Sequence, residues 1–348
     1  MVVSLRSLVV LWFGLVGSAR ALSSPMTMSD AKPVLVVGAT GRVGRRVVQQ
    51  LMAQNRPVRA IVRNPDKARE LFGTSTSFVH PPFQVHVADL GHYDRDETIL
   101  DEAMKGVDTV LSVSGVVRFS KWTDFLPWRL FDQAPQQWAD RSHPYYGNYL
   151  AQKKLLELAE KHNVRRFVRL TGLGLAHPPY HPFSVLFNTI LSFSNRWGLL
   201  CEQAMFDSPV PTIVLRPGGL AEDARQTNTT HLQIDASGKL PYPCRVGRAD
   251  VAALAVAAGD LQNGQSYTLA ARWCGPDVKP RPQGVKEDGY GTAGECMDHL
   301  VQSKAISPRP PKMKMYGIFV GMTVYALAAV GLRLGLALTR LVLRLLRG

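Results

Sequence analysis

Short apolar runs alternate with longer amphipathic stretches through the middle of the chain. Residues 33–63 read PVLVVGATGRVGRRVVQQLMAQNRPVRAIVR, in which an apolar run, a glycine-rich turn, a stretch with helical spacing and a second apolar run follow one another. An uninterrupted apolar run is typical of a strand that is buried on both faces of a parallel sheet. The pattern therefore predicts a βαβ unit with a right-handed crossover.

The same alternation continues toward the C-terminus. Apolar runs predict further strands at 83–90, 107–115, 165–173 and 211–220. Amphipathic stretches predict helices between them at 96–106, 148–163 and 195–207. Strands that alternate with helices are typical of the α/β class, so we expect a doubly wound parallel-sheet Rossmann fold over residues 32–272.

The first turn of this domain has the glycine spacing of a dinucleotide-binding loop. Gly38 permits a tight turn, Gly41 lets the backbone approach a pyrophosphate, and Gly44 lets the helix lie close to the strand. The helix N-terminus adds free N–H groups and the positive end of the helix dipole. The candidate cofactor contacts in this turn are Gly38, Thr40, Gly41, Arg42, Val43 and Gly44. The alternative is a turn that keeps its glycines for packing alone.

The second predicted strand ends at Arg63, where an NAD-selective site would have an acidic residue for the ribose 2′-hydroxyl. Arg63 and Arg42 together suit a 2′-phosphate, because guanidinium groups bind phosphate oxygens well. The sequence thus favours NADP(H) as the cofactor over NAD(H). Two solvated arginines without a ligand are the alternative.

The N-terminal 21 residues resemble a targeting peptide. Arg6 precedes an apolar run over residues 8–16, which is too short to span a bilayer, and an Ala19-x-Ala21 motif follows. A signal peptide and entry into the secretory pathway are the first interpretation, with an uncleaved anchor as the alternative. Residues 22–32 are rich in hydroxyl groups, so a bipartite plastid leader also stays open.

The C-terminal part predicts membrane attachment. Residues 273–312 are rich in Pro, Gly and charge and are expected to form a flexible linker. Residues 315–332 hold no charge, so a single transmembrane helix is predicted over 315–338, and a cationic amphipathic tail over 339–348. The expected partners are the lipid bilayer and, through two glycine pairs in the helix, a membrane protein. A buried helix of a soluble protein is the alternative.

Charge and cysteines exclude two classes of function. The chain has a formal charge of +14, but ten of its 41 basic residues lie in 1–29 and 299–348, which hold no acid. The middle is therefore nearly neutral, and no nucleic-acid partner is expected. The four cysteines are widely spaced, so no metal site is expected. A disulfide between Cys274 and Cys296 is compatible with an oxidising compartment.

An ordered series of motifs now identifies a family. The GATGxxG turn is followed by VRNPDKA, Asp89-Leu90, VRRFVRLTGLG, TIVLRPGGL and VGRADVAALAV. Over residues 33–270 this series resembles the atypical short-chain dehydrogenase/reductases of the NmrA-like, NAD(P)H-binding branch. The resemblance implies cofactor contacts after successive strands: Asp89 and Leu90 at the adenine, Ser112 and Gly115 along the cofactor, Thr171 with Pro217 and Gly218 at the nicotinamide.

The catalytic Tyr-x-x-x-Lys pair of active members is not found in its expected place. Tyr149 and Lys153 have the spacing, but they precede the predicted strand that ends at Thr171, whereas the family has the pair after it. Counting back from Glu202, a residue common in this branch, gives Gly198 at the lysine position and Ser194 at the tyrosine position. We therefore interpret Tyr149 and Lys153 as a coincidence of spacing.

Two functions remain open at this point. Thr171 and Tyr180 are weak candidates for a substitute acid, and an aromatic stretch over 118–148 could cover an apolar substrate, enter a bilayer or cover core. The first function is a membrane-tethered oxidoreductase that uses NADP(H) on a small apolar or membrane-associated substrate. The second is a non-catalytic redox sensor or membrane-complex assembly factor.

Overall fold

The computed structural model describes residues 31–73, 83–125, 140–178, 180–222, 225, 230–240, 244–274 and 290–307, and a few residues between 325 and 340. The main feature of this part is an eight-stranded sheet with the strand order β3-β2-β1-β4-β5-β6-β10-β8. All neighbouring strands in it are parallel except β10 and β8, which pair antiparallel. The predicted α/β Rossmann architecture is confirmed.

The strands are β1 (Val34–Val37), β2 (Val58–Val62), β3 (Phe83–Val87), β4 (Thr109–Ser112), β5 (Arg166–Leu170), β6 (Thr212–Pro217), β8 (His231–Asp235) and β10 (Tyr267–Cys274), with β7 (Gly219–Ala221) and β9 (Arg245–Gly247) forming a separate parallel pair.

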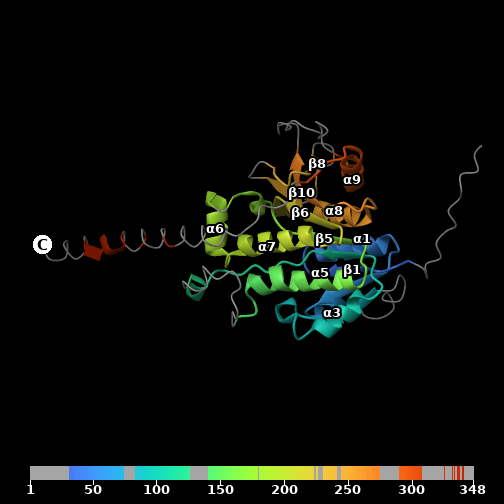
Figure 1. Ribbon diagram of the computed structural model, residues 1–348, viewed down its shortest axis with the longest axis horizontal. Helices are drawn as coiled ribbons and strands as arrows, with labels where there is room; N and C mark the ends of the chain where they lie inside the picture. The colour runs from blue at the N-terminus through green and yellow to red at the C-terminus, as the bar shows by residue number, and fades with distance from the viewer. Residues whose placement is uncertain are drawn as a thin grey trace, which may run out of the picture. The chain divides into compact units, whose positions relative to one another are not determined.

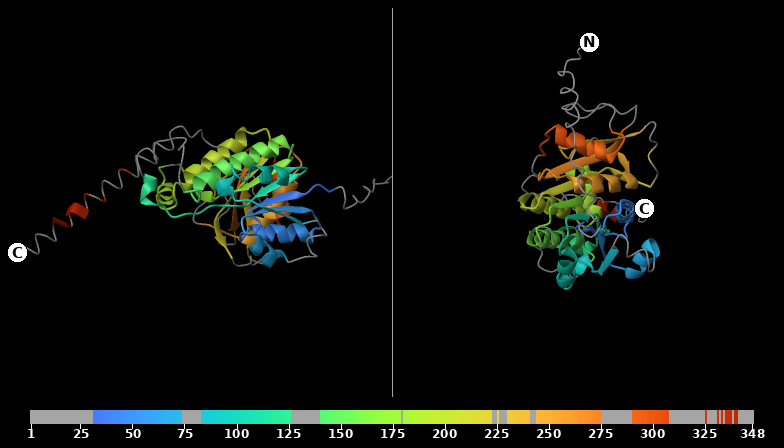
Figure 2. Two further views of the ribbon diagram at one scale, coloured as in Figure 1. Left: turned by 90° about the horizontal axis from the view of Figure 1, so that it is seen from below. Right: turned by 90° about the vertical axis from the view of Figure 1, so that its right-hand side faces the viewer.

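Helices cover both faces of the sheet (Figures 1 and 2). One face carries α1 (Gly44–Ala53), α2 (Pro65–Phe72), α8 (Arg248–Asp260) and α9 (Ala293–Gln302). The other carries α3 (Glu97–Met104), α5 (Ala151–Lys161) and α7 (Ser194–Asp207). Between α5 and α7 in the chain lies α6 (Pro182–Ile190). The shorter helical turns are η1 (Leu90–His92), η2 (Trp122–Phe125), the π-helical turn η3 (Tyr145–Leu150) and η4 (Leu173–Ala176).

The first strand explains the apolar pattern of its sequence. Val34 and Val36 pack in the core under α1 and α8, whereas Leu35 and Val37 pack in the core under α3, α5 and α7. Both side-chain rows of β1 are thus excluded from water, and the strand needs an uninterrupted apolar run.

The domain extends further than the sequence indicates. Residues 273–312 are predicted to be a linker, but α9 lies within them and packs on α8, with Cys296, Met297 and Leu300 buried. Thr292 caps this helix by accepting a hydrogen bond from the backbone N–H of Glu295. Thr-x-x-Glu is a capping-box signal. The linker prediction is wrong for residues 290–307. A short helix with a single apolar face is stable here because it packs against the hydrophobic core that the sheet and α8 already form.

The two ends of the chain are mostly outside the described residues. This applies to the predicted targeting peptide and to most of the predicted helix over 315–338 and tail over 339–348. Within the part that the structure describes, no helix has both the length and the apolar character that crossing a membrane requires. All four cysteines have free thiols, so the Cys274–Cys296 disulfide is not formed.

Candidate functional site

The glycine turn after β1 has the geometry that its sequence predicts. Gly38 has a φ of +83°, which is strained for any other residue. A Cβ on Gly44 would lie 2.1 Å from the carbonyl oxygen of Gly38, so a side chain cannot fit between the turn and α1. Gly41 donates its backbone N–H to the same oxygen at 3.0 Å. The bare backbone and the start of α1 thus form a cradle that fits a dinucleotide pyrophosphate.

A cluster of arginines lies beside this turn. Glu222, which follows β7, forms ion pairs with Arg42 at 3.4 Å, Arg46 at 3.2 Å and Arg248 at 3.0 Å. One carboxylate therefore faces three guanidinium groups, and the cluster keeps an excess of positive charge. Such an excess at the N-terminus of α1 favours an anionic ligand.

The candidate residues near the adenosine part of the cofactor follow strands that end at the same edge of the sheet as the glycine turn. β1 and β2 pair in parallel with Val37 opposite Ile61, which brings Arg63 to the level of the glycine turn. Arg63 is exposed. Asp89 follows β3, and its carboxylate accepts a hydrogen bond from the backbone N–H of Gly91, while Leu90 is half-buried. Residues that are far apart in the sequence thus lie at one edge of the sheet, because the carboxyl ends of parallel strands meet there.

A cavity of about 300 Å³ lies at the carboxyl ends of β5 and β6, against the start of α7. Gly115, Thr171, Pro217 and Gly218, all candidates from the sequence, line it. Other lining residues come from the loop after β4, from η3, β5, η4, α6 and α7: Val116, Val117, Asn148, Arg169, Leu173, Leu175, Phe187, Ser194, Asn195 and Gly198. The predicted nicotinamide side is therefore a hollow lined mainly by apolar and uncharged polar groups.

Ser112 is not part of the cavity wall. It is fully buried, donates a hydrogen bond to Gln152 at 2.6 Å and accepts one from Arg169 at 3.0 Å. Arg169 also donates to the carbonyl oxygen of Ser114 at 2.6 Å. Burial lowers the pKa of the Arg169 guanidinium. The hydroxyl of Ser112 is therefore paired within the protein, and its role as a cofactor contact stays a prediction.

A second buried group supports the other side of the cavity. The hydroxyl of Thr171 donates to Glu202 at 2.9 Å, and Glu202, which has no exposed surface, forms an ion pair with Arg216. Thr171 is thereby oriented by a charged pair that does not itself line the cavity. As a hydrogen-bond donor to Glu202, its hydroxyl has no second proton to donate to a ligand.

Ser194 and Gly198, where the sequence analysis expects the family's Tyr and Lys, lie in the cavity wall. Ser194 and Gly198 line it from the first turns of α7. A Cβ on Gly198 would meet the side chain of Leu175 at 2.9 Å, so η4 occupies the space of a larger residue. Neither residue supplies an acid near neutral pH.

Tyr149 and Lys153 lie elsewhere. Tyr149 packs in the aromatic cluster around Trp197, and burial raises the pKa of its hydroxyl, the opposite of what proton donation needs. Lys153 is half exposed and approaches Glu157 at 4.0 Å. Tyr180 is 71% exposed and does not line the cavity.

The aromatic stretch over 118–148 is only partly described, since residues 126–139, with Trp128, Phe131 and Trp138, lie outside the described residues. Phe119 and Trp122, before that gap, are exposed. After the gap, Tyr145 and Tyr146 are buried, so this part covers core.

The sequence analysis did not identify several residues that line or support the cavity. Asn148 holds the loop after β4 through two hydrogen bonds with the backbone of Val116, both at 2.8 Å, and lines the cavity from η3. A π-helical turn has no simple sequence signal, although such turns are frequent at functional sites. Arg169 and Arg216 could have been found, because a charged residue inside an apolar strand is rarely buried without a purpose.

Comparisons with known proteins agree with this geometry. Residues 38–260 match the model of a family described as NAD(P)H-binding. An uncharacterized chloroplastic protein of Arabidopsis thaliana is 24% identical over 77% of this chain and 74% of its own length. Protein TIC 62, chloroplastic, from the same plant is 26% identical over 60% of this chain but only 31% of its own length. Sanguinarine reductase of Eschscholzia californica is 23% identical over 73% of this chain and 91% of its own.

A solved structure supports the fold. A putative NAD-dependent epimerase/dehydratase from Bacillus halodurans superposes with a TM-score of 0.54 at 19% identity, covering 78% of this chain and 100% of its own. The resemblance to atypical short-chain dehydrogenase/reductases and the NAD(P)H type of cofactor are both confirmed, because the family model covers most of the chain. The chain belongs to the NAD(P)H-binding family of Rossmann proteins.

Proposed function

We propose that this protein is an NADP(H)-dependent oxidoreductase that reduces a small apolar substrate at a membrane. The observation that carries the proposal is the cavity between Gly115, Thr171 and Pro217, which adjoins the strand ends where this family binds its cofactor. Bound NADPH supplies a hydride. The chain's own residues would orient the substrate and exclude water. Three relatives are reductases by name, which supports the chemistry.

The preference for NADP(H) over NAD(H) rests on the arginines. Arg63 stands where an acidic residue would select NAD(H), and the Arg42 cluster keeps an excess of positive charge beside the turn. Arg63 and Arg42 would hold the 2′-phosphate.

The apolar walls of the cavity support an apolar substrate. Leu173, Leu175 and Phe187 are among the lining residues, and no aspartate or glutamate lines the cavity within the described part of the chain. The Thr171 hydroxyl donates its proton to Glu202 and has none left for a carbonyl or quinone oxygen, so the proton that completes the reduction would come from a water molecule.

Membrane attachment through residues 315–338 and delivery to a plastid are part of the proposal. The uncharged run and its flanking cations support attachment. Several relatives are chloroplastic by name, which favours the plastid leader over the secretory route.

A second function has its own observation. Ser194 and Gly198 replace the proton-donating pair, and this favours a non-catalytic redox sensor or assembly factor that binds the cofactor without turnover. The name of TIC 62 marks a chloroplast protein, but this chain matches less than a third of it, so a shared partner is only a proposal.

One experiment tests both. The full chain is titrated calorimetrically with NADPH and NADH, as wild type, as Arg63→Ala and as the matched control Arg69→Ala, an exposed arginine of α2. We expect about tenfold weaker NADPH binding in Arg63→Ala only, with NADH binding unchanged. No binding of either cofactor by the wild type would refute the proposal.

Turnover is then measured with apolar aldehydes, ketones and quinones in wild type, Thr171→Val and Thr171→Ser. Reduction that falls in the valine variant and survives in the serine variant supports the oxidoreductase. Tight NADPH binding without turnover of any member of the panel supports the sensor.

A further inference from the structure

The segment after β4 reverses the usual arrangement of polar and apolar side chains. Residues 115–121 alternate between exposed and half-buried, and the charged Arg118 is on the inner side. Val117, Phe119 and Trp122 point outward, with exposed fractions of 74%, 76% and 77%. A loop in contact with water normally does the opposite, since burying a charge is costly and exposing large apolar side chains is unfavourable.

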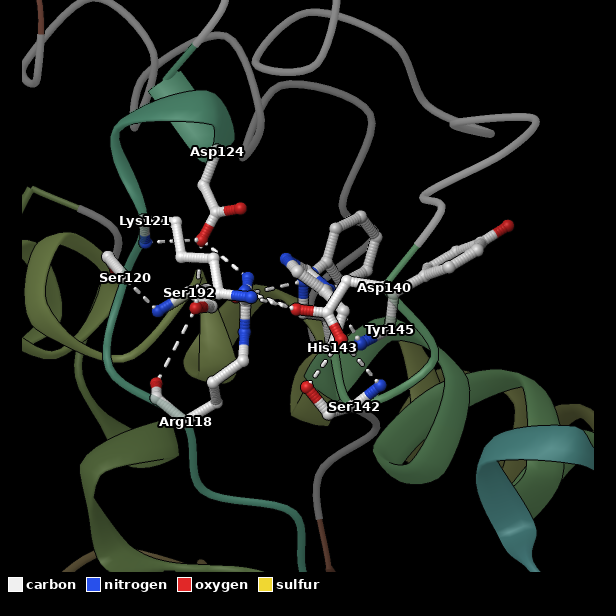
Figure 3. Close-up of polar contacts among 10 residues, drawn as sticks. Arg118, Ser120, Lys121, Asp124, Asp140, Ser142, His143, Tyr145 and Ser192 are labelled. Atoms are coloured by element: carbon white, nitrogen blue, oxygen red, sulfur yellow. Dashed lines mark hydrogen bonds and ion pairs between the residues drawn. The ribbon is translucent and has the colours of Figure 1, made fainter.

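A buried polar network holds this reversed loop (Figure 3). Arg118 donates to Asp124 at 2.6 Å and to Asp140 at 2.9 Å, and Asp124 is 1% exposed. The hydroxyl of Ser192 donates to the same Asp124 carboxylate at 3.0 Å. The Arg118–Asp124 ion pair fixes the inner side of the loop, and the loop therefore holds Phe119 and Trp122 pointing outward.

The neighbouring helix α6 is reversed in the same way. Its buried residues are polar, Ser184 and Asn188, and both have no exposed surface. Asn188 accepts a hydrogen bond from the backbone N–H of Arg196 at 3.2 Å. Leu186 and Ile190, one helical turn apart, are 49% and 41% exposed. The side of α6 that faces away from the protein is therefore apolar.

The two reversed segments are joined. The backbone N–H of Ser120 donates to the carbonyl oxygen of Ile190 at 2.8 Å, and the N–H of Ser192 donates to the hydroxyl of Ser120 at 2.7 Å. We call the outward residues of the two segments the apolar face; they are Val117, Phe119, Trp122, Tyr180, Leu186 and Ile190.

The charges of this region indicate what covers the apolar face. Residues 113–123 and 180–192 hold no acidic residue, and Lys121 keeps 58% of its side chain exposed while it forms an ion pair with Asp140 at 2.6 Å. Trp122 and Tyr180 combine an apolar ring with a polar tip, which suits the boundary between headgroups and acyl chains. A cation beside exposed apolar side chains fits an anionic lipid surface.

We propose that the apolar face docks on the surface of an anionic lipid bilayer. Val117 and Phe187 also line the cavity, so docking would bring the cavity next to the acyl region, from which an apolar substrate would enter. This last step rests on the proposed oxidoreductase function, whereas docking itself needs neither cofactor nor turnover.

The test maps lipid contact on the full chain in the absence of NADPH. The chain is reconstituted into vesicles of phosphatidylcholine with 30% phosphatidylglycerol (a fraction of about one third, chosen to give a strongly anionic surface) that carry a trace of a photoactivatable phospholipid. After illumination, lipid adducts are located by mass spectrometry. We expect adducts on peptides covering 113–122 and 182–191, and none on α9.

Variants decide whether the side chains cause the contact. Phe119→Ser/Trp122→Ser should lower the adduct yield on α6 by about fivefold or more, because the apolar area that anchors the surface is lost. The control Val301→Ser/Ile306→Ser removes exposed apolar side chains from the other end of the domain and should change nothing. Thermal unfolding checks that all variants fold.

Three outcomes would overturn the proposal. Adducts confined to residues beyond 307 would mean that only the C-terminal part contacts lipid. Absence of adducts from 113–122 and 182–191, together with a dimer in analytical ultracentrifugation that Phe119→Ser/Trp122→Ser converts to a monomer, would mean that the apolar face is a dimer interface. Equal adducts in wild type and in Phe119→Ser/Trp122→Ser would mean that these side chains do not bind lipid. None of these outcomes bears on NADPH titration or turnover, so failure of docking and failure of the proposed activity are distinguishable.

Discussion

The two ends of the candidate site are built by different means. At the glycine turn, the site consists of backbone, and its geometry follows from side chains that are absent at Gly38 and Gly44. At the cavity, the site consists of side chains from β5, β6, η3 and α7, held by buried polar groups such as Glu202 and Arg216. The first end comes from residues close together in sequence, and the second from residues that only the fold brings together.

This difference sets how much change of sequence each end of the site tolerates. A turn that must be free of side chains tolerates little change, because a single Cβ meets backbone that cannot move. A cavity wall can exchange its side chains as long as the buried groups behind it stay paired. Ser194 and Gly198 lie in such a wall, and the buried Thr171–Glu202 hydrogen bond behind it is intact.

The largest effect is expected at the turn. Gly44→Ala places a Cβ 2.1 Å from the Gly38 carbonyl oxygen, so α1 must move away from β1. We expect a loss of about 4 kcal/mol in the free energy of unfolding and loss of measurable NADPH binding. Urea unfolding and calorimetry measure the two effects. The control is Gly294→Ala in the first turn of α9, where the nearest atom is 3.9 Å away and no loss is expected.

The next effect is expected behind the cavity. Glu202→Gln leaves the Arg216 guanidinium buried without its counter-charge, which should cost about 3–5 kcal/mol of the free energy of unfolding. Glu202→Leu/Arg216→Met should be less destabilised than either single variant, since no charge then stays buried. Asp260→Asn, which breaks the half-exposed pair with Arg56, is the control and should cost under about 1 kcal/mol. Equal losses in the buried and exposed pairs would contradict this assignment.

A smaller effect is expected at position 198, where Leu175 limits the space for a lysine side chain. Gly198→Lys would press on Leu175, whose side chain lies 2.9 Å from the added Cβ, and should cost about 1–3 kcal/mol. In a Leu175→Ala background the same substitution should cost about 1 kcal/mol less, because the space is then open. A double-mutant cycle by urea unfolding measures this coupling. Strict additivity would show that Leu175 does not limit position 198.

The smallest effect lies away from the site, on the helices that support it. Asp101 of α3 accepts hydrogen bonds from Lys161 at 2.7 Å and His162 at 2.9 Å, and the Lys161 hydrogen bond is the main reason that the pKa of Asp101 falls to about 2. A lowered folded-state pKa stabilises the protein above about pH 4, and this stability is lost as the pH falls through 2.

Because Lys161 is 61% exposed and solvent screens its charge, we expect less than about 1 kcal/mol. Unfolding free energies of wild type and Asp101→Asn should differ at pH 5 and converge at pH 2. Asp66→Asn, an exposed partner of Arg69, is the control. A difference between wild type and Asp101→Asn that stays constant with pH would rule out the ionised carboxylate as its source.

The sequence alone determined the parts that depend on local pattern. The uninterrupted apolar run of β1, the glycine spacing of the turn and the alternation of strands and helices were enough for the Rossmann fold, the cofactor type and the edge of the sheet where Arg63 and Asp89 lie. These features are readable because each is fixed by neighbours within a few residues.

Only the tertiary structure decided which side chains are buried and which groups they contact. The sequence marks Ser112 as a cofactor contact, but its hydroxyl is consumed by Gln152 and Arg169, which approach from α5 and β5. It marks 290–307 as part of a linker, but α9 packs its apolar side chains against α8. The outward direction of Phe119 depends on a carboxylate, Asp124, that also binds Ser192 far along the chain. Burial and pairing of a side chain depend on long-range contacts, and no local pattern contains them.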